Sequence, residues 1–449
     1  MKLCIIGTGH VGLVTGACFA EIGNQVICVD NDEEKIKMIK RGRMPIYEPE
    51  LEELVKRNAG EGRLSFSTSI AEGTRKSRVI FIAVGTPPRE NGEADLSSVE
   101  KVCREIVRNM KDYRLIVEKS TVPVQTGQWI KHIFQLSNNH VDFDIASNPE
   151  FLREGSAVRD FLNPDRIVIG VERERAAEIL RQLYQPIINR EFNSDLRIPA
   201  SSSDPVPLLV TDIQSSEIIK HASNSFLATK ISFINAVADL CERTGADVEK
   251  VAQGMGYDPR IGSSFLKAGV GFGGFCFPKD LQAFIRIAEK LNYDFTLLKE
   301  AQRINKERPR QLVRKLEEAL WILKDKTIGV LGLSFKPYTD DMRFAPSIEV
   351  IKLLQKEGAK VIKAYDPVAT PNARLFLNNI EYVSSPYEAA SGSDALVIIT
   401  EWEEFRNLDL EKIKGLLETP VIVDGRNIYD PREMQKLGFI YKSIGRGSS

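Results

Sequence analysis

The chain has 449 residues, of which 43% are hydrophobic, and its 61 basic and 62 acidic residues leave a formal net charge of −1. A chain of this length exceeds a single hydrophobic core, so two or three domains are expected. The balanced charge argues against a nucleic-acid or membrane-surface partner, while a local basic cluster could still bind a small anion. No apolar run reaches membrane-spanning length and the chain starts with a strand-like run, so we expect a soluble, cytoplasmic protein.

The first 200 residues alternate strand-like and helix-like segments. Each strand-like segment is rich in β-branched residues and ends at Gly, Pro, Ser, Asn or an acid. The strands are KLCIIGTG (2–9), QVICVD (25–30), RVIFIAVGTPP (78–88), RLIVEKSTVP (114–123) and DFDIASNPE (142–150), and VGLVTGACFAEIG (11–23) is a helix. This alternation predicts a doubly wound parallel sheet.

The character of the chain changes after a loop-like stretch at 197–207. Residues 211–245 have long helical periodicity ended by Gly245. The strand pattern then returns in KTIGVLGLSFKP (326–337), KVIKAYDP (360–367), DALVIITEW (394–402) and PVIVDGRN (420–427). We therefore predict an α/β fold with two Rossmann-like domains, 1–207 and 308–449, joined by a helical domain at 208–307 that contains one long helix.

A glycine-rich turn follows the first strand. GTGHVG (7–12) fits GxGxxG, and Asp30 ends the next strand 23 residues after Gly7. In such a turn the first glycine permits the tight bend, Gly9 admits a pyrophosphate and Gly12 lets the helix pack on the strand. Asp30 would bind a ribose hydroxyl and repel a 2′-phosphate, so the pattern favours NAD over NADP.

The second Rossmann-like region has no GxGxxG. Its first strand leads instead into GLSFKPYTDDMR (332–343), which carries Lys336 and Arg343, and Arg426 follows the last strand. These cations suit a different phosphate-bearing ligand, although ordinary surface salt bridges explain them equally well.

The six cysteines are scattered without CxxC spacing, and the four histidines show no ligand spacing with them, so we predict neither disulfides nor a metal site. Cys276 differs from the others because it lies between a glycine-rich turn and Pro278 in GVGFGGFCFPKD (269–280). Pro278 fits the first position of a helix, which would put the thiol at a helix N-terminus and lower its pKa. The alternative is a small buried core residue.

Two further pairs have helical spacing. Lys220 and Asn224 are four residues apart, so a charge and an amide share one helix face and suit an oxyanion. A single lysine on a helix is more often simply solvated. Asp280 follows Cys276 by four residues, where an acid also stabilises a helix dipole.

Several long motifs, in order, resemble the UDP-glucose/GDP-mannose dehydrogenase family over nearly the whole chain. They are GTGHVG (7–12), PIYEPELEEL (45–54), FIAVGTPP (81–88), EKSTVP (118–123), NPEFLREGSAVRDFLNPDRIVIG (148–170), FLKAGVGFGGFCFPKD (265–280), FKPYTDDMR (335–343) and DGRN (424–427). The chain departs from the family at Glu50, where a glycine is usual, and at Arg78, where an acid is common.

The resemblance implies a four-electron oxidation of a sugar's primary alcohol to a carboxylate by two NAD+ in succession. It implies that Cys276 captures the aldehyde as a thiohemiacetal, whose oxidation gives a thioester that water hydrolyses. Lys220 and Asn224 would stabilise oxyanions, Asp280 with Thr121 would hold water, and Glu150 would be the base for hydrolysis. Whether Lys220 or water on Asp280 accepts the first proton stays open.

The resemblance also implies two binding sets. The cofactor set is Gly7, Gly9, His10, Val11, Gly12, Asp30, Lys35, Thr86, Thr121, Glu154, Lys279 and Arg343. The substrate set is Glu150, Phe151, Leu152, Arg153, Lys220, Asn224, Arg260, Phe265, Leu266, Lys267, Ala268, Gly269, Gly273, Lys336 and Arg426. In the family, Arg260 reaches the substrate of the neighbouring subunit, which implies a homodimer built on the long helix, with the central domain forming the dimer and the C-terminal domain binding a UDP-sugar.

The motif CFPKD with FLKAGVGFGG resembles the family's UDP-glucose branch, whereas relatives acting on GDP-mannose tend to carry CLPKD. The expected substrate is therefore UDP-glucose, with GDP-mannose or a UDP-N-acetyl sugar as alternatives. A two-electron hydroxyacid dehydrogenase would need neither the Cys276 loop nor a second nucleotide-type domain. A non-enzymatic dinucleotide sensor would leave Cys276, Lys220, Asn224 and Asp280 without a role.

Overall fold

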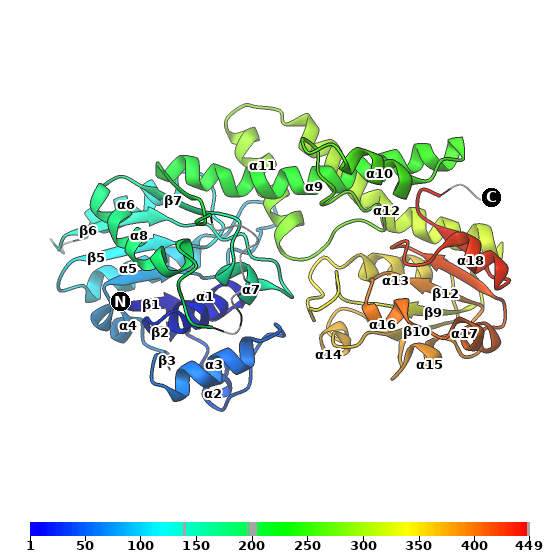
Figure 1. Cartoon of the computed structure of the whole chain (residues 1–449), viewed down its shortest axis with the longest axis horizontal. Coiled ribbons are helices and arrows are strands. Elements are labelled where there is room, and N and C mark those ends of the chain that lie inside the picture. Colours follow the sequence, from blue (N-terminus) through cyan, green and yellow to red (C-terminus); the bar gives the residue numbers. More distant parts are fainter. Residues whose placement is uncertain (138–140, 195, 197–203, 447–449) are drawn as a thin grey trace. The chain divides into compact units, whose positions relative to one another are not determined.

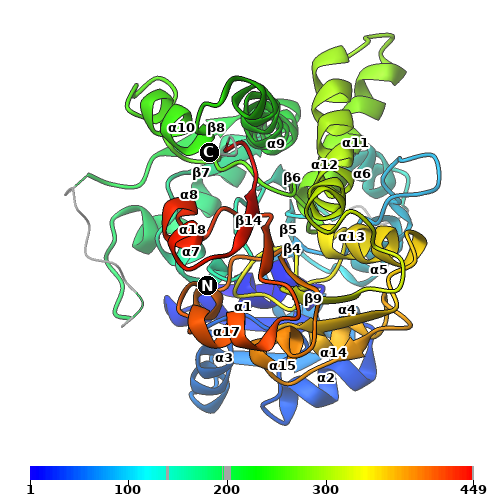
Figure 2. The same cartoon turned by 90° about the vertical axis from the view of Figure 1, so that its right-hand side faces the viewer.

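The computed structural model describes residues 1–137, 141–194, 196 and 204–446, and the chain forms two compact units, Met1–Ser223 and Asn224–Ser449 (Figures 1 and 2). Each unit is described by itself. Most of the loop expected at 197–207, and His140, lie outside the described residues.

The described part of the first unit contains an eight-stranded sheet in the order β3-β2-β1-β4-β5-β6-β7-β8. Its strands are β1 (Lys2–Ile6), β2 (Gln25–Val29), β3 (Leu64–Ser67), β4 (Val79–Ile82), β5 (Arg114–Glu118), β6 (Phe143–Ser147), β7 (Ile167–Val171) and β8 (Leu208–Thr211). Its helices are α1 (His10–Glu21), α2 (Glu33–Lys40), α3 (Leu51–Gly60), α4 (Ile70–Lys76), α5 (Ser97–Asn109), α6 (Thr126–Gln135), α7 (Ala157–Leu162), α8 (Glu174–Ile188) and the start of α9 (Ile213–Thr244). All neighbouring strands run parallel except β6 and β7.

Alternate residues of β1 serve two separate cores. Leu3 and Ile5 pack with residues of α1, α3, α7 and α8, whereas Cys4 and Ile6 pack with residues of α5 and α6. A strand covered by helices on both faces is buried at nearly every position, so its sequence is continuously apolar. This is why β1, β2, β4 and β5 were predictable as uninterrupted apolar runs.

The described part of the second unit contains a six-stranded parallel sheet in the order β11-β10-β9-β12-β13-β14. Its strands are β9 (Thr327–Leu331), β10 (Val361–Tyr365), β11 (Glu381–Tyr382), β12 (Ala395–Ile398), β13 (Val421–Asp424) and β14 (Ile440–Ser443). Its helices, besides the rest of α9, are α10 (Val248–Gly256), α11 (Cys276–Lys290), α12 (Thr296–Leu320), α13 (Pro346–Lys356), α14 (Thr370–Ala373), α15 (Pro386–Ala390), α16 (Glu403–Arg406), α17 (Leu410–Leu416) and α18 (Pro431–Lys436).

The two sheets and the long helix α9 confirm the predicted fold class. Helix α9 has 32 residues and continues through the boundary between the units. Gly245 follows it with a φ of +76°, the left-handed conformation that ends helices. Because β8 pairs with β7 in the first sheet, the first unit extends beyond residue 207, and the three-domain division stays a prediction.

In the second sheet, the acid that follows β10 is buried by its own loop. Asp366 is 3% exposed and accepts hydrogen bonds from six donors: Leu333 N, Ser334 N, Ser334 Oγ and Trp402 Nε1 on one oxygen, and Val368 N and Ala369 N on the other. The carboxylate therefore closes the turn after β9 instead of facing a ligand.

We predict that Asp366→Ala lowers the free energy of unfolding by about 3 kcal/mol, because it leaves buried amide donors without an acceptor. The matched control is Asp409→Ala, which removes an exposed helix-capping acid that accepts from Lys412 N and should cost about 1 kcal/mol. Urea unfolding followed by circular dichroism measures both. Equal midpoints for the two variants would contradict the structural role of Asp366.

Candidate functional site

The turn between β1 and α1 fits a dinucleotide at each of its three glycines. Gly7 has a φ of +104°, and a Cβ there would lie 2.4 Å from Ala83 O. A Cβ on Gly12 would lie 2.0 Å from Gly7 O, whereas nothing lies within 4 Å of one on Gly9. The turn is thus closed on its protein side and open in front of Gly9, as pyrophosphate binding at a helix N-terminus requires.

Asp30 lies at the carboxyl end of β2, beside this turn. Its carboxylate accepts hydrogen bonds from Thr8 N at 2.8 Å, Thr8 Oγ1 at 2.7 Å and Lys35 Nζ at 3.3 Å. Partial burial acts to raise the pKa of Asp30, but the hydrogen bonds from Thr8 and Asp32 and the charge of Lys35 outweigh it, so the pKa is lowered. The ionised carboxylate suits a ribose hydroxyl.

A cleft along this sheet edge brings together Gly7, Gly9, Asp30 and Lys35 from the predicted cofactor set, and α5 adds Lys101 and Arg108 to its lining. Val11, in the first turn of α1, packs against the hydrophobic core that contains Leu3 and Ile5.

His10, the first residue of α1, is held by Glu48. Their Nε2 and Oε2 atoms lie 2.7 Å apart, and Glu48 also accepts from Gly155 N and Ala157 N. Burial disfavours the charged imidazole, but the bond to Glu48 and the charge of Glu154 raise the pKa of His10 above its ordinary value. Glu48 therefore ties the glycine-rich turn to the loop that carries Glu154.

Lys220 and Glu150 form a buried ion pair in the first unit. The Nζ of Lys220, on α9, lies 2.8 Å from Glu150 Oε1 and 2.5 Å from Glu150 O, and both side chains are about 5% exposed or less. Leu152 N donates to the other carboxylate oxygen at 2.6 Å, and the Lys220 ammonium lies 5.4 Å from the Phe151 ring. The structure thus brings together two residues predicted to take part in catalysis.

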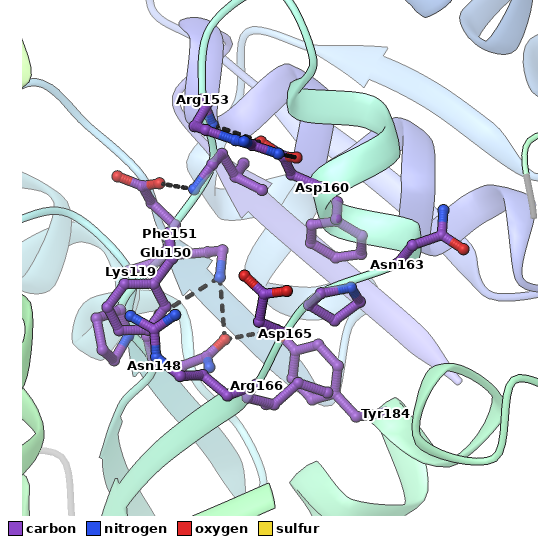
Figure 3. Close-up of a pocket in the computed structure, with 15 residues that line it drawn as sticks. Lys119, Asn148, Glu150, Phe151, Arg153, Asp160, Asn163, Asp165, Arg166 and Tyr184 are labelled. Carbon is purple, nitrogen blue, oxygen red and sulfur yellow. Dashed lines mark hydrogen bonds and ion pairs between the residues drawn. The ribbon is translucent and has the colours of Figure 1, made fainter. Parts of the chain in front are cut away.

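The segment 148–153 lines a pocket (Figure 3). A second buried lysine of this unit, Lys119, also lines it. Lys119 donates to Asn148 Oδ1 at 3.1 Å, and Tyr184 donates to the same oxygen at 2.6 Å. Burial lowers the pKa of Lys119 to about 8, partly offset by the charge of Glu150. Arg153, at the end of the segment, pairs with Asp160 at 2.6 Å (Figure 3).

Thr86 and Thr121 follow neighbouring strands, β4 and β5, and contact each other directly. The hydroxyl of Thr86 donates to Thr121 O at 2.8 Å. Both therefore lie at the carboxyl edge of the first sheet, where α/β folds bind ligands.

In the second unit, α11 begins at Cys276, so the thiol lies at a helix N-terminus as predicted. Pro278 is the third residue of the helix rather than the first, which costs no hydrogen bond because the first-turn amides have no partner within the helix. Cys276 is half-buried, whereas the other five cysteines are buried and burial raises the pKa of each.

Asp280 lies one turn after Cys276 and is fully buried. Its two oxygens accept from Asn224 Nδ2 at 2.7 Å and from Lys279 Nζ at 2.6 Å. The predicted residues Cys276, Lys279, Asp280 and Asn224 are therefore neighbours, and the amide and the ammonium hold the carboxylate in place.

The loop at 265–273 runs against the carboxyl edge of the second sheet. A Cβ on Gly269 would lie 2.7 Å from Gly425 O, and one on Gly273 would lie 2.3 Å from Phe344 O, so both positions require close backbone approach. Arg426 donates to Gly271 O at 3.1 Å and to Ile399 O at 2.8 Å, which fixes its guanidinium. Leu266 and Ala268 are buried in this loop, Phe265 is half-buried and Lys267 is exposed.

The other predicted cations of this unit lie on aromatic rings or beside acids. Lys336 lies 5.6 Å from the Phe335 ring, and Arg343 lies 4.2 Å from the Phe275 ring and pairs with Asp341. Arg260 is exposed and pairs with Asp258 at 2.6 Å.

Among the described residues, no group of three or more His, Cys, Asp or Glu side chains could hold a metal ion. No helix in that part of the chain is both long enough and apolar enough to span a membrane.

The glycine turn and the two predominantly parallel sheets define a dinucleotide-binding α/β protein. Three models of the UDP-glucose/GDP-mannose dehydrogenase family match the chain in order: its NAD binding domain at residues 1–188, its central domain at 214–307 and its UDP binding domain at 329–431. The chain therefore belongs to the UDP-glucose/GDP-mannose dehydrogenase family, and the resemblance stated from the sequence is confirmed.

Similar proteins cover the whole chain. UDP-glucose 6-dehydrogenase TuaD of Bacillus subtilis (strain 168) is 48% identical over 99% of this chain and 93% of the relative, and UDP-glucose 6-dehydrogenase of Rhizobium meliloti (strain 1021) is 47% identical over 99% and 100%. The structure of a UDP-glucose dehydrogenase from Pyrobaculum islandicum is 39% identical over 100% of this chain and 98% of the other, with a TM-score of 0.90.

Sequence reasoning missed two residues of this site, Glu48 and Lys119. Both lie inside motifs that the resemblance rests on, PIYEPELEEL and EKSTVP. A charged residue in each of these motifs was the only sequence signal for them. Their hydrogen-bond partners lie about 30 and 110 residues away in the chain, so the sequence did not show what they contact.

We predict that iodoacetamide at neutral pH alkylates Cys276 at least ten times faster than any other cysteine of the folded chain. The helix N-terminus and partial exposure favour its thiolate, whereas burial protects the other five thiols. Peptide mass spectrometry gives the order of labelling, and Cys276→Ser is the control that should remove the fast phase. Faster labelling at any other cysteine would contradict this assignment.

Proposed function

We propose that this chain oxidises UDP-glucose to UDP-glucuronate with two NAD+, as a UDP-glucose 6-dehydrogenase. The observation that carries the proposal is the position of Cys276, a partly buried thiol at a helix N-terminus, one turn before Asp280. Two relatives that share 47% and 48% identity over nearly their full length bear that name. The match of residues 329–431 to a UDP binding domain supports a UDP-sugar as the substrate class.

NAD+ supplies the acceptor for one hydride in each of two oxidations. The residues around Gly7, Gly9 and Asp30 fit this cofactor, and we propose that the remaining members of the predicted cofactor set contact it as the resemblance implies. The first oxidation converts the C6 alcohol to an aldehyde and releases one proton.

Cys276 then adds through its sulfur to the aldehyde carbon, which forms a C–S bond and an alkoxide. Loss of a hydride from that carbon gives a thioester, and water breaks the C–S bond to release the carboxylate and the thiol. We propose that Lys220 and Asn224 stabilise the oxyanions, since an ammonium and an amide both donate hydrogen bonds. A missing donor of this kind costs about 2.7–4 kcal/mol of barrier.

Glu150 is the proposed base for thioester hydrolysis, and Asp280 with Thr121 the proposed holders of water. The contacts of Glu150 with Lys220 and of Asp280 with Asn224 and Lys279 fix each carboxylate before substrate binds. The substrate contacts proposed for the loop at 265–269, Lys336 and Arg426 rest on the same resemblance.

We predict two NADH per limiting UDP-glucose, read from absorbance at 340 nm, and a rate at least 100-fold lower for Cys276→Ser. Cys241→Ser, which replaces a buried thiol of the same unit, is the matched control and should retain the stoichiometry. One NADH per sugar would show an ordinary alcohol dehydrogenase. Turnover with GDP-mannose or a UDP-N-acetyl sugar, but not UDP-glucose, would keep the chemistry and overturn the substrate.

We also propose that the protein forms a homodimer through α9. Phe226, Phe233 and Leu240 are each more than half exposed and recur every seven residues, so they form one apolar stripe on the helix. Large apolar side chains in such a stripe are typical of a surface that another chain covers. A cytoplasmic location stays a prediction from the sequence.

We predict that the double substitution Phe226→Glu and Phe233→Glu converts the dimer to a monomer, because it places charges in an apolar interface. Sedimentation velocity gives the mass of each form. Leu291→Glu, at a 70% exposed residue after α11, is the control and should sediment as wild type. A wild-type monomer, or a double variant of unchanged mass, would contradict the proposed dimer.

A further inference from the structure

The second and third turns of α9 bury two polar side chains against the segment that follows β5. The carboxylate of Glu217 accepts from Gln125 N at 2.7 Å and from Gly127 N at 2.8 Å. One turn further along the helix, His221 Nε2 lies 2.8 Å from Val122 O. Both side chains are 3% exposed or less.

The contacts of Glu217 stabilise the start of α6, which has no capping hydrogen bond from its own N-cap side chain. Gln125, at the N-cap of α6, has a φ of +77° and makes no capping hydrogen bond with its side chain. A left-handed non-glycine residue is strained and persists only where neighbouring structure holds it. Glu217, about 90 residues away in the sequence, supplies both the acceptor and the negative charge that a helix N-terminus favours.

The start of α9 also packs closely against the start of α6. A Cβ on Gly127 would lie 2.5 Å from Ile213 Cγ2, so the start of α6 approaches α9 as closely as a glycine permits. The side chains of Glu217 and His221 therefore fix the register between two elements in direct contact.

We propose that Glu217 and His221 are positioning residues that set Lys220 relative to Thr121. Lys220 lies between them on α9, and Thr121 immediately precedes Val122 on the segment that they hold. The inference rests on the proposed function, in which Lys220 and Thr121 belong to the catalytic set, and it adds two residues to which the resemblance assigned no role.

The charged groups around Glu217 make its effect depend on pH. The charge of Glu217 acts on Glu118 of β5, and Asp212 immediately precedes the helix that carries Glu217. Lys220 and His221 share that helix, and the N-terminus of α6 lies at the carboxylate oxygens of Glu217. Burial raises the pKa of Glu217 to about 7, and burial with the added charge of Glu217 raises the pKa of Glu118 to about 8. Glu118 Oε2 is buried without a hydrogen-bond partner among the described residues, which favours the protonated form of Glu118, whereas Glu217 becomes ionised only as the pH rises through about 7.

Protonation of Glu217 removes the cost of burying its charge, although the resulting hydroxyl accepts from its amide less well than a carboxylate oxygen does. The raised pKa means that the first effect is the larger one, because a carboxyl that binds its proton more tightly when buried favours the buried state as the pH falls. The segment at 122–127 should therefore be held more tightly below about pH 7 and loosen as the pH rises above it.

The test is Glu217→Gln in the full chain, which keeps the shape but replaces one of the two acceptor oxygens with an NH2 group that cannot accept from an amide. Hydrogen–deuterium exchange by mass spectrometry should show at least tenfold faster exchange in peptides covering 122–130 at pH 8. In wild type, but not in the variant, protection corrected for intrinsic exchange should rise from pH 8 to pH 6. The kcat for UDP-glucose should fall about tenfold while the KM for NAD+ changes less than twofold, since small misplacements of catalytic groups lower rates strongly.

The matched control is Asp212→Asn, which removes a negative charge immediately before the same helix, where the carboxylate bonds only to its neighbours Thr211 and Ser215. It should leave the exchange of 122–130 unchanged, and His221→Gln should repeat the effect of Glu217→Gln at smaller size. Unchanged exchange in Glu217→Gln would overturn the inference, as would faster exchange with an unchanged kcat in an active enzyme. Absence of NADH formation by wild type would overturn the proposed function instead, and the exchange result would still decide whether Glu217 holds the segment.

Discussion

Lys220 and Glu150 are both almost fully buried, and an isolated charge at either position would cost several kcal/mol of desolvation. Each therefore requires the other, and the further bond from Lys220 to the Glu150 carbonyl ties the segment after β6 to α9. Lys119 adds a second buried ammonium near the same carboxylate.

Several continuously buried strands were predictable from the sequence, whereas three short and partly exposed strands were missed. The strands β1, β2, β4 and β5 are continuously apolar because helices cover both faces of the sheet. The strands β3, β8 and β11 are short and partly exposed, so their sequences carry no such signal. The antiparallel pairing of β6 with β7 depends on the path of the chain through 148–166, which periodicity does not describe.

Site residues within one motif were predictable because their spacing is local. The Lys220 and Asn224 pair, the Cys276 and Asp280 pair and the glycine turn each follow from helix or turn geometry. The supports of these groups, such as Glu48 on His10 and Glu217 on the start of α6, join positions tens of residues apart. Glu50 is intermediate: its φ of +69° explains the glycine usual at that position, but its partner Arg159 is visible only in the folded chain.

In the two Rossmann-like sheets, an acid at the same place after the second strand has two different roles. In each, an acid after the second strand bonds to the turn after the first, Asp30 to Thr8 and Asp366 to Ser334. Asp30 stays partly exposed beside an open glycine, so it can still accept from a ribose. Asp366 is enclosed by six donors, including the indole of Trp402, so under the proposed function a ligand of the second sheet would rely on Arg426 and its neighbouring cations instead. In that proposal, phosphate is recognised by backbone amides in one unit and by side-chain charge in the other.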